Sequence, residues 1–278
     1  MRKYKHLLVM FLSVLLFFSV PNIVMAGESD QYYSFSYLKN DLRSQLMQEG
    51  LSEEQINDFI KAEIDASKAI AESIKQNTNN PSTRSVEIPD DGGSLIYVGL
   101  FDPLTKYTAS EGNEETETLL LAQAYADAKI FHNSNHVAAA AYGGSAQAIA
   151  WTGFRFTVNE DYYGVTSGTG RIDITYSADH YLVGGNTVAS ISNYIGVYDV
   201  TEGSWILRKM MDVNSALKGE AKSVAFFDKN FWSDDVTFKV GHEYVVTFET
   251  KANADFSARV NEIQLLHNSS WSRIHINW

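Results

Sequence analysis

The 278-residue chain contains no cysteine and only four prolines. Without cysteine it has no disulfide bond, no zinc–thiolate site and no thiol that could carry a lipid, so its core alone must hold the fold. Positive charge is also scarce, because 22 Lys and Arg face 34 Asp and Glu, which gives a formal net charge of −12. A negative field repels phosphates, so this balance argues against nucleic acid and against an anionic membrane as partners.

Long apolar runs are rare as well. The run from Leu7 to Val20 follows three basic residues and precedes a proline and a short Val-Met-Ala segment. This pattern predicts a signal peptide over residues 1–26, cleaved between Ala26 and Gly27. An uncleaved membrane anchor is the alternative, but the run is short for the ~30 Å hydrocarbon core of a bilayer. We therefore expect a secreted protein without a permanent membrane anchor. Removing three basic and no acidic residues moves its net charge from −12 to −15.

A helical hairpin is predicted over residues 27–78. Apolar residues recur there at spacings of three and four, first up to Leu46 and again after Ser52. Gly50 interrupts the pattern, and Ser52 with Gln55 three residues later forms a capping-box sequence. The sequence leaves open whether the apolar stripe packs on its partner helix, on the later domain or on another molecule.

The segment 79–93 reads as a linker, because it holds two of the four prolines and no sustained periodicity. Beyond it, residues 94–278 alternate with a period of two. The clearest case is the stretch from Val236 to Thr250, where the even positions up to Phe248 are Val, Phe, His or Tyr and most odd positions are polar. This alternation predicts strands with one dry and one wet face, and Gly241 marks a turn between two of them.

About nine to eleven such runs are separated by Gly, Asn, Asp and Ser clusters, a spacing typical of sandwiches. The predicted fold class is mainly β, an antiparallel β-sandwich or jelly-roll-like domain preceded by a short N-terminal helical hairpin. The alanine-rich residues 118–132 are ambiguous, because alanine also favours helix. Alternation farther along, at Ala146, Ala148 and Ala150, favours strands there too.

No catalytic residue and no metal site is predicted. His132 and His136 have helical ligand spacing but lack the H-E-x-x-H sequence, and there is no G-x-S-x-G. His242 falls in the apolar register of its strand, which favours a structural role. No cofactor is expected. A structural calcium ion is an open alternative, since hard oxygen ligands are plentiful at Asp90, Asp91, Glu111 to Glu117, Asp228, Asp234 and Asp235.

Aromatic residues near predicted turns and strand ends are the candidate ligand-binding residues: Trp205, Trp232, Trp271, Tyr162 and Tyr163. Flat rings with a polar edge stack on sugar faces, although aromatic residues in a sandwich are more often core. The leading hypothesis is a noncatalytic extracellular binding module with a glycan or a cell-surface protein as its ligand. One alternative is a carbohydrate-active enzyme, a lyase or glycosidase, that uses Glu160, Asp161 or His180. Another is an assembly protein whose N-terminal helices dock on a partner.

Overall fold

The computed structural model describes residues 35–48, 50–79, 95–98, 105–119, 122–130, 133–141, 144–158, 167–184, 189–216, 219–254 and 263–277. Side chains are described for residues 42–48, for 50–78 and, within these ranges, from 111 to 254. The chain divides into two units, Met1–Gln31 and Tyr32–Trp278, and every described residue belongs to the second. The predicted signal peptide and residues 80–93 of the predicted linker lie outside the described residues.

Two antiparallel sheets form the domain, which confirms the predicted fold class. The five-stranded sheet has the order β2 (Thr105–Leu119), β5 (Ser145–Val158), β10 (Glu243–Ala254), β7 (Ala189–Asp199) and β8 (Ser204–Ala216). The six-stranded sheet has the order β3 (Ala122–Lys129), β4 (Ser134–Ala141), β11 (Ile263–Asn277), β6 (Ser167–Val183) and β9 (Ala221–Lys239). Its remaining strand, β1 (Leu95–Val98), runs parallel to β11. Within the ambiguous alanine-rich segment 118–132, residues 118–119 and 122–129 are strand, as predicted.

Two helices precede the strands, α2 (Phe35–Gln48) and α3 (Glu53–Asn79). Gly50 between them has a φ of +84°, a conformation that glycine adopts readily. The predicted capping box is confirmed: the Ser52 backbone N–H donates to Gln55 Oε1 over 2.8 Å, and the Gln55 N–H donates to Ser52 Oγ over 3.3 Å. Neither described helix is both long enough and apolar enough to cross a membrane.

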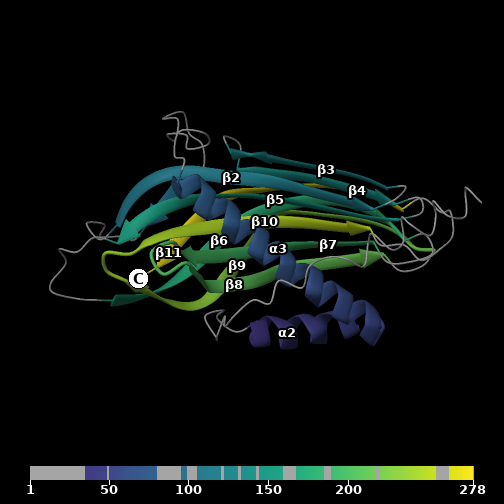
Figure 1. Ribbon diagram of the computed structural model, residues 1–278, viewed down its shortest axis with the longest axis horizontal. Coiled ribbons are helices and arrows are strands. Elements are labelled where there is room, and N and C mark those ends of the chain that lie inside the picture. The colour runs from purple at the N-terminus through teal and green to yellow at the C-terminus, as the bar shows by residue number, and fades with distance from the viewer. Residues whose placement is uncertain are drawn as a thin grey trace, which may run out of the picture. The chain divides into compact units, whose positions relative to one another are not determined.

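The apolar stripe of α3 is buried against the five-stranded sheet, and the helix crosses β2, β5, β10, β7 and β8 diagonally (Figure 1). Ile70 and Ile74 of α3 pack with Ile149 and Trp151 of β5 and with Val245 of β10. Leu42 and Leu46 of α2 complete the helical layer beside β8. The sequence left three possible partners open for this stripe. In the structure, the stripe of α3 packs on a sheet of the same chain.

The interior between the two sheets has two halves of different chemistry. One half is filled by large side chains, among them Phe154, Phe156, Tyr176, Phe238 and Phe248. The other is built mainly from alanines on β3, β4, β5 and β10, with Val137, Leu182 and Ile191 as the larger members. Small side chains let the two layers of backbone approach more closely there, because packed interiors leave few voids.

The structure corrects one prediction for the stretch Val236 to Thr250. Of its even positions, Val236, Phe238, Tyr244, Val246 and Phe248 are buried as predicted, whereas Val240 and His242 are only partly buried. Gly241 lies in the turn with a φ of +81°. The odd face of β10, however, is not wet: Thr247, Glu249 and Lys251 have at most 2% of their surface exposed. The physical reason is α3, which covers this face of the sheet. His242 also leaves the apolar register, since it lies in the turn with Nδ1 2.8 Å from Asp199 Oδ2.

Candidate functional site

A row of polar side chains crosses the helix-covered face of the five-stranded sheet near one end of its strands. Glu117 on β2 is opposite Gln147 on β5, which is opposite Asn253 on β10, which is opposite Ser190 on β7. Directly opposed residues on neighbouring strands have Cβ atoms only about 5 Å apart. We call Glu117, Gln147, Asn253 and Ser190 the polar row.

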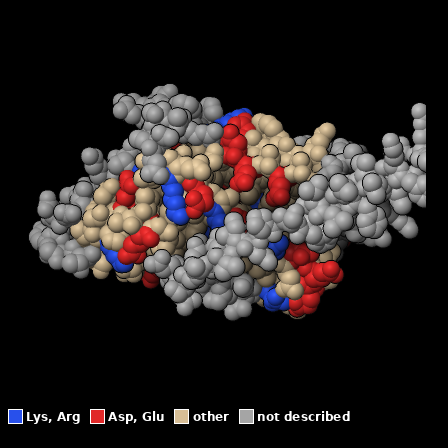
Figure 2. Space-filling view, viewed as in Figure 1, with Lys and Arg blue, Asp and Glu red and all other residues tan. Residues whose placement is uncertain are grey.

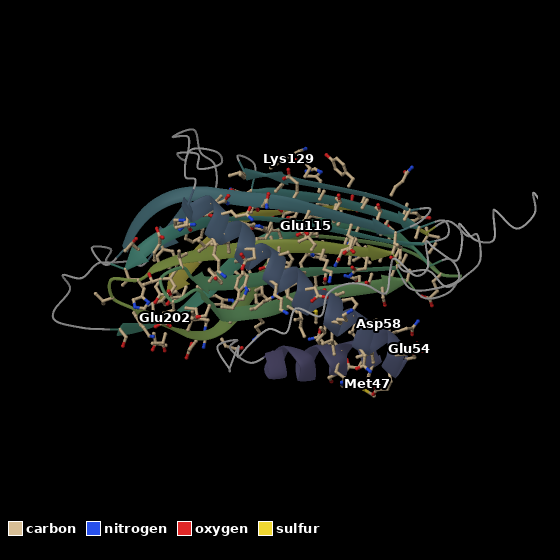
Figure 3. All side chains as sticks on the ribbon, in the orientation of Figure 1. Met47, Glu54, Asp58, Glu115, Lys129 and Glu202 are labelled. Atoms are coloured by element: carbon tan, nitrogen blue, oxygen red, sulfur yellow. The ribbon has the colours of Figure 1, made fainter. Side chains whose placement is uncertain are left out.

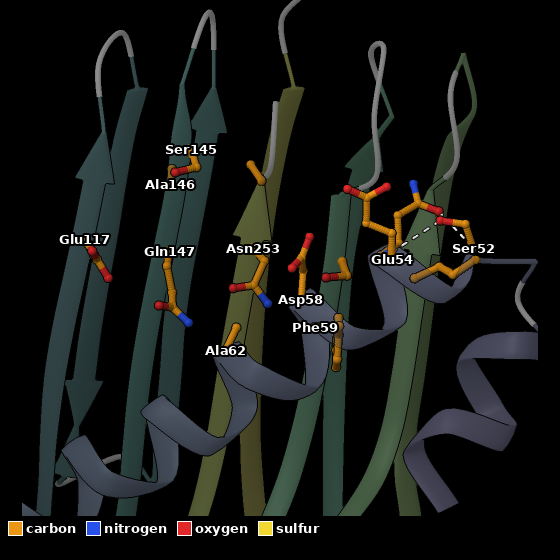
Figure 4. Close-up of a pocket in the computed structure, with 14 residues that line it drawn as sticks. Ser52, Glu54, Asp58, Phe59, Ala62, Glu117, Ser145, Ala146, Gln147 and Asn253 are labelled. Atoms are coloured by element: carbon orange, nitrogen blue, oxygen red, sulfur yellow. Dashed lines mark hydrogen bonds between the residues drawn. The ribbon is translucent and has the colours of Figure 1, made fainter. Parts of the chain in front are cut away.

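A pocket of about 570 Å³ lies between this polar row and the first turns of α3. The helix contributes Glu54, Asp58, Phe59 and Ala62 to its lining, and the close-up in Figure 4 shows them facing the strands that carry the row. Pockets for small ligands commonly have volumes of ~300–1,000 Å³, so this one has the size of a binding site.

The amides of the polar row have unused hydrogen-bonding capacity. Gln147 Nε2 and Asn253 Nδ2 each have less than 1 Å² of accessible surface, and neither has a hydrogen-bond partner among the described residues. A buried amide donor without a partner costs about 1–3 kcal/mol relative to a satisfied one. The two side chains as a whole are partly exposed in the pocket lining, so rotation of either amide toward the pocket would let its nitrogen donate to an acceptor of a ligand.

Carboxylates surround the amides, while the described lining contains neither lysine nor arginine. Glu54 and Asp58 extend from α3, and Glu117 stands at the β2 end of the polar row (Figure 4). Acidic side chains gather in several places on the face that carries α3 (Figure 2). Figure 3 places Glu54 and Asp58 on the first turns of the helix.

A buried charge cluster, Glu63, Arg208, Glu249 and Lys251, fixes α3 beside the pocket. Glu63 Oε1 of α3 lies 3.2 Å from Lys251 Nζ, with which it forms an ion pair, and accepts a hydrogen bond from Ser192 Oγ over 3.2 Å. Arg208 Nη2 lies 2.7 Å from Glu249 Oε2 and 3.7 Å from Glu63 Oε2. Burial lowers the pKa of Lys251 and raises that of Glu249, whereas the opposite charges of the cluster act against both shifts.

Polar contacts continue along α3 beyond the charge cluster. Trp205 Nε1 donates to the backbone carbonyl of Ser67 over 3.2 Å, and Trp151 Nε1 donates to Ser73 Oγ over 3.0 Å. Gly196 makes room for the Trp205 ring, because a Cβ at that position would lie 2.5 Å from its Cζ3. The helix is thus held in one register on the sheet, and this register places its first turns over the polar row.

Of the five predicted ligand-binding aromatic residues, Trp205 and Trp232 have described side chains, and they lie in different sheets. Trp205 is 3% exposed and packs under α3, so its ring is closed off from a ligand in this structure. Trp232 is 50% exposed on β9, in the other sheet. Trp271 lies on β11 with its side chain outside the described part, and Tyr162 and Tyr163 lie outside the described residues altogether.

The pocket residues were missed by sequence reasoning. Asn253 continues the odd-numbered face of β10, and Gln147 alternates with Ala146 and Ala148, so both were visible as polar positions in alternating strands. Their pairing joins residues more than a hundred positions apart, which is a property of the sheet and not of either local pattern.

Of the three residues of the enzyme alternative, only His180 lies in the described part of the chain. His180 is 1% exposed inside the sandwich, and burial lowers its pKa to about 4, so it is neutral near pH 7. Glu160 and Asp161 lie outside the described residues.

One group in the described part of the chain has ligand atoms close enough for a metal ion, namely Asp199, Glu202 and His242, within 4.8 Å of one another. Asp199 and Glu202 already have internal partners, because Asp199 binds His242 and Glu202 pairs with Lys239. The calcium alternative stays a prediction.

No protein-family model matches the chain. No curated protein matches it either. Among solved structures, a family 22 carbohydrate-binding module of Clostridium thermocellum is 10% identical, covering 56% of this chain and 85% of its own, with a TM-score of 0.19.

A family 11 carbohydrate-binding module of the same organism, solved with a mixed-linked tetrasaccharide, is 6% identical over 67% of this chain and 94% of its own, with a TM-score of 0.22. Infectious bursal disease virus has a chain that is 10% identical over 65% of this one and 47% of its own, with a TM-score of 0.19. Sugar-binding modules and a virus protein thus score alike, so these similarities carry no argument about a ligand.

Proposed function

We propose that the protein is a secreted, noncatalytic binding module whose ligand is a glycan held in the pocket between α3 and the polar row. The observation that carries this proposal is the pair of shielded, unpartnered amide nitrogens of Gln147 and Asn253 inside a pocket of about 570 Å³. Secretion is supported by the predicted signal peptide at residues 1–26.

A sugar suits this lining because each hydroxyl both donates and accepts a hydrogen bond. The amide nitrogens supply donors, while the amide oxygens and the carboxylates of Asp58 and Glu117 supply acceptors. Phe59 and Ala62 add apolar surface for the C–H groups of a sugar ring. A purely apolar ligand would leave the amides unpartnered, which disfavours that class.

The docking surface that the assembly alternative requires is buried. Its predicted docking element was the apolar stripe of the N-terminal helices, but Ile56, Ile60, Ile70 and Ile74 are each at most 5% exposed within the chain itself.

A glycan array followed by calorimetric titration tests the proposal on the full secreted chain. Gln147→Ala and Asn253→Ala should each weaken binding of the best array ligand about tenfold, the effect of losing roughly 1.4 kcal/mol of hydrogen bonding. The matched control is Gln123→Ala, an exposed glutamine on β3, which should bind like wild type. Thermal melting of all three variants shows whether the fold is retained.

Three outcomes would contradict the proposal. These are an array without any bound glycan, equal binding by Gln147→Ala and Gln123→Ala, and release of cleaved sugar from the bound ligand. The third outcome would favour the enzyme alternative instead.

A further inference from the structure

The pocket also carries negative charge. Some acidic side chains elsewhere on the described surface have basic partners: Glu53 pairs with Arg43, Glu72 with Lys75, and Asp234 with Lys209. Around the pocket, Glu54, Asp58 and Glu117 are exposed, and no ion pair joins any of them to a described residue. The pocket therefore presents uncompensated negative charge.

The nearest cation on the same sheet face is unavailable to a ligand. Lys251 is two residues before Asn253 on β10, so the two side chains point to the same face. Lys251 is 2% exposed, and its Nζ binds Glu63 of the charge cluster. An acidic sugar entering the pocket would thus meet carboxylates without a neutralising partner, and like charges oppose such binding.

The residues of the polar row are also regularly spaced along a line across the strands. Glu117, Gln147 and Asn253 follow one another across neighbouring strands at intervals of about 4.8 Å. This interval is close to the length that one pyranose ring adds to an extended chain. Asp58 on α3 lines the same pocket as Asn253, so the helix and the β2 end of the polar row each contribute a carboxylate beside the two amides (Figure 4).

We infer that the pocket selects linear glycans that carry free, protonated amino groups, with Asp58 and Glu117 as the specificity-determining residues and the amides of Gln147 and Asn253 as the ring-binding groups. This inference rests on the proposed glycan-binding function and adds the chemical class of the sugar. In this arrangement, the amino groups pair with the two carboxylates while ring hydroxyls bond to the amides.

Titration of the full chain with three short oligosaccharides of equal length tests the inference. They are a β-1,4-linked glucosamine oligomer, its fully N-acetylated counterpart and a galacturonic acid oligomer. The titrations are run at about pH 5.5, at which the amino groups of the glucosamine oligomer are protonated. We expect the glucosamine oligomer to bind about tenfold more tightly than the acetylated one at low salt, and the galacturonic acid oligomer not to bind.

Raising the salt concentration should reduce this preference several-fold, because exposed charges are screened. Asp58→Asn and Glu117→Gln should reduce it as well while leaving binding of the acetylated oligomer within about twofold. The matched control is Asp179→Asn, which removes one exposed charge from β6 in the other sheet and should leave the preference unchanged.

The outcomes separate the inference from the function it rests on. Equal binding of the amino and acetylated oligomers, or an unchanged preference in both Asp58→Asn and Glu117→Gln, overturns the inference and leaves glycan binding intact. An equal loss in Asp179→Asn overturns it too, because it would reveal nonspecific attraction to an acidic protein. If none of the three oligomers binds and no glycan on the array binds, the proposed glycan-binding function itself is wrong.

Discussion

The two faces of β10 are equally buried and chemically opposite. Toward the other sheet, Tyr244, Val246 and Phe248 have no exposed surface. Toward α3, Glu249 and Lys251 are at most 2% exposed. The inner face is stabilised by apolar burial and close packing, which need no particular partner. The outer face depends on matched charges, because each buried charge requires its counterpart.

This difference separates stability from positioning. The inner face holds the two sheets together, whereas the charge cluster on the outer face fixes where α3 lies and hence where the pocket is. Substitutions on the two faces should therefore fail in different ways, and three predictions test this from the largest expected effect to the smallest.

Phe248→Ala should lower the free energy of unfolding by about 4 kcal/mol, because it removes a fully buried ring and leaves a cavity in the aromatic half of the interior. Urea denaturation measures the change. Phe227→Ala is the control, since that ring is 78% exposed and its loss should change stability by less than about 0.5 kcal/mol. Similar losses in both variants would mean that the inner face does not carry the stability.

Lys251→Met should destabilise the protein by about 3 kcal/mol, because it leaves Glu63 buried without its closest cation. The double variant Glu63→Met with Lys251→Met should recover to within about 1 kcal/mol of wild type, since apolar replacement of a buried pair is often neutral. Lys239→Met, which breaks the exposed pair with Glu202, is the control, with an expected loss of at most about 1 kcal/mol.

Thermal melting and urea denaturation of the single, double and control variants measure these changes in stability. A double variant as unstable as the single one would show that the pair contributes net stability and does more than fix the position of α3.

The smallest expected effect is a dependence on pH from the inner face. Burial lowers the pKa of His180 from 6.5 to about 4 in the folded protein. Between these values the unfolded chain binds a proton that the folded chain does not, so stability falls as the pH falls. From pH 7 to pH 4.5, His180 should cost the wild type about 2 kcal/mol.

His180→Gln should remove this dependence, and the difference between the two proteins at each pH isolates it. The comparison is needed because the raised pKa of Glu249 on the outer face acts in the opposite direction over an overlapping pH range. Parallel stability curves for wild type and variant would mean that His180 is accessible to protons in the folded state.

Local patterns predicted the elements well. The capping box at Ser52 and Gln55, the turn at Gly241 and the burial of most even positions from Val236 to Phe248 all appear in the structure. Each depends on residues within a few positions of one another, whose spacing determines which way their side chains point. Trp205 shows the limit of such patterns: its place near a turn suggested exposure, yet a helix more than a hundred residues away covers it.

By itself, the sequence determined that this chain forms two helices followed by a sandwich of antiparallel strands with a dry interior. Only the tertiary structure decided that α3 covers the polar face of one sheet, that Glu117, Gln147, Asn253 and Ser190 form one row, and that a pocket lies above them. The reason is that the direction of a side chain follows from the local period of the backbone. The alignment of distant strands and the position of a helix on a sheet depend instead on contacts between residues far apart in the chain.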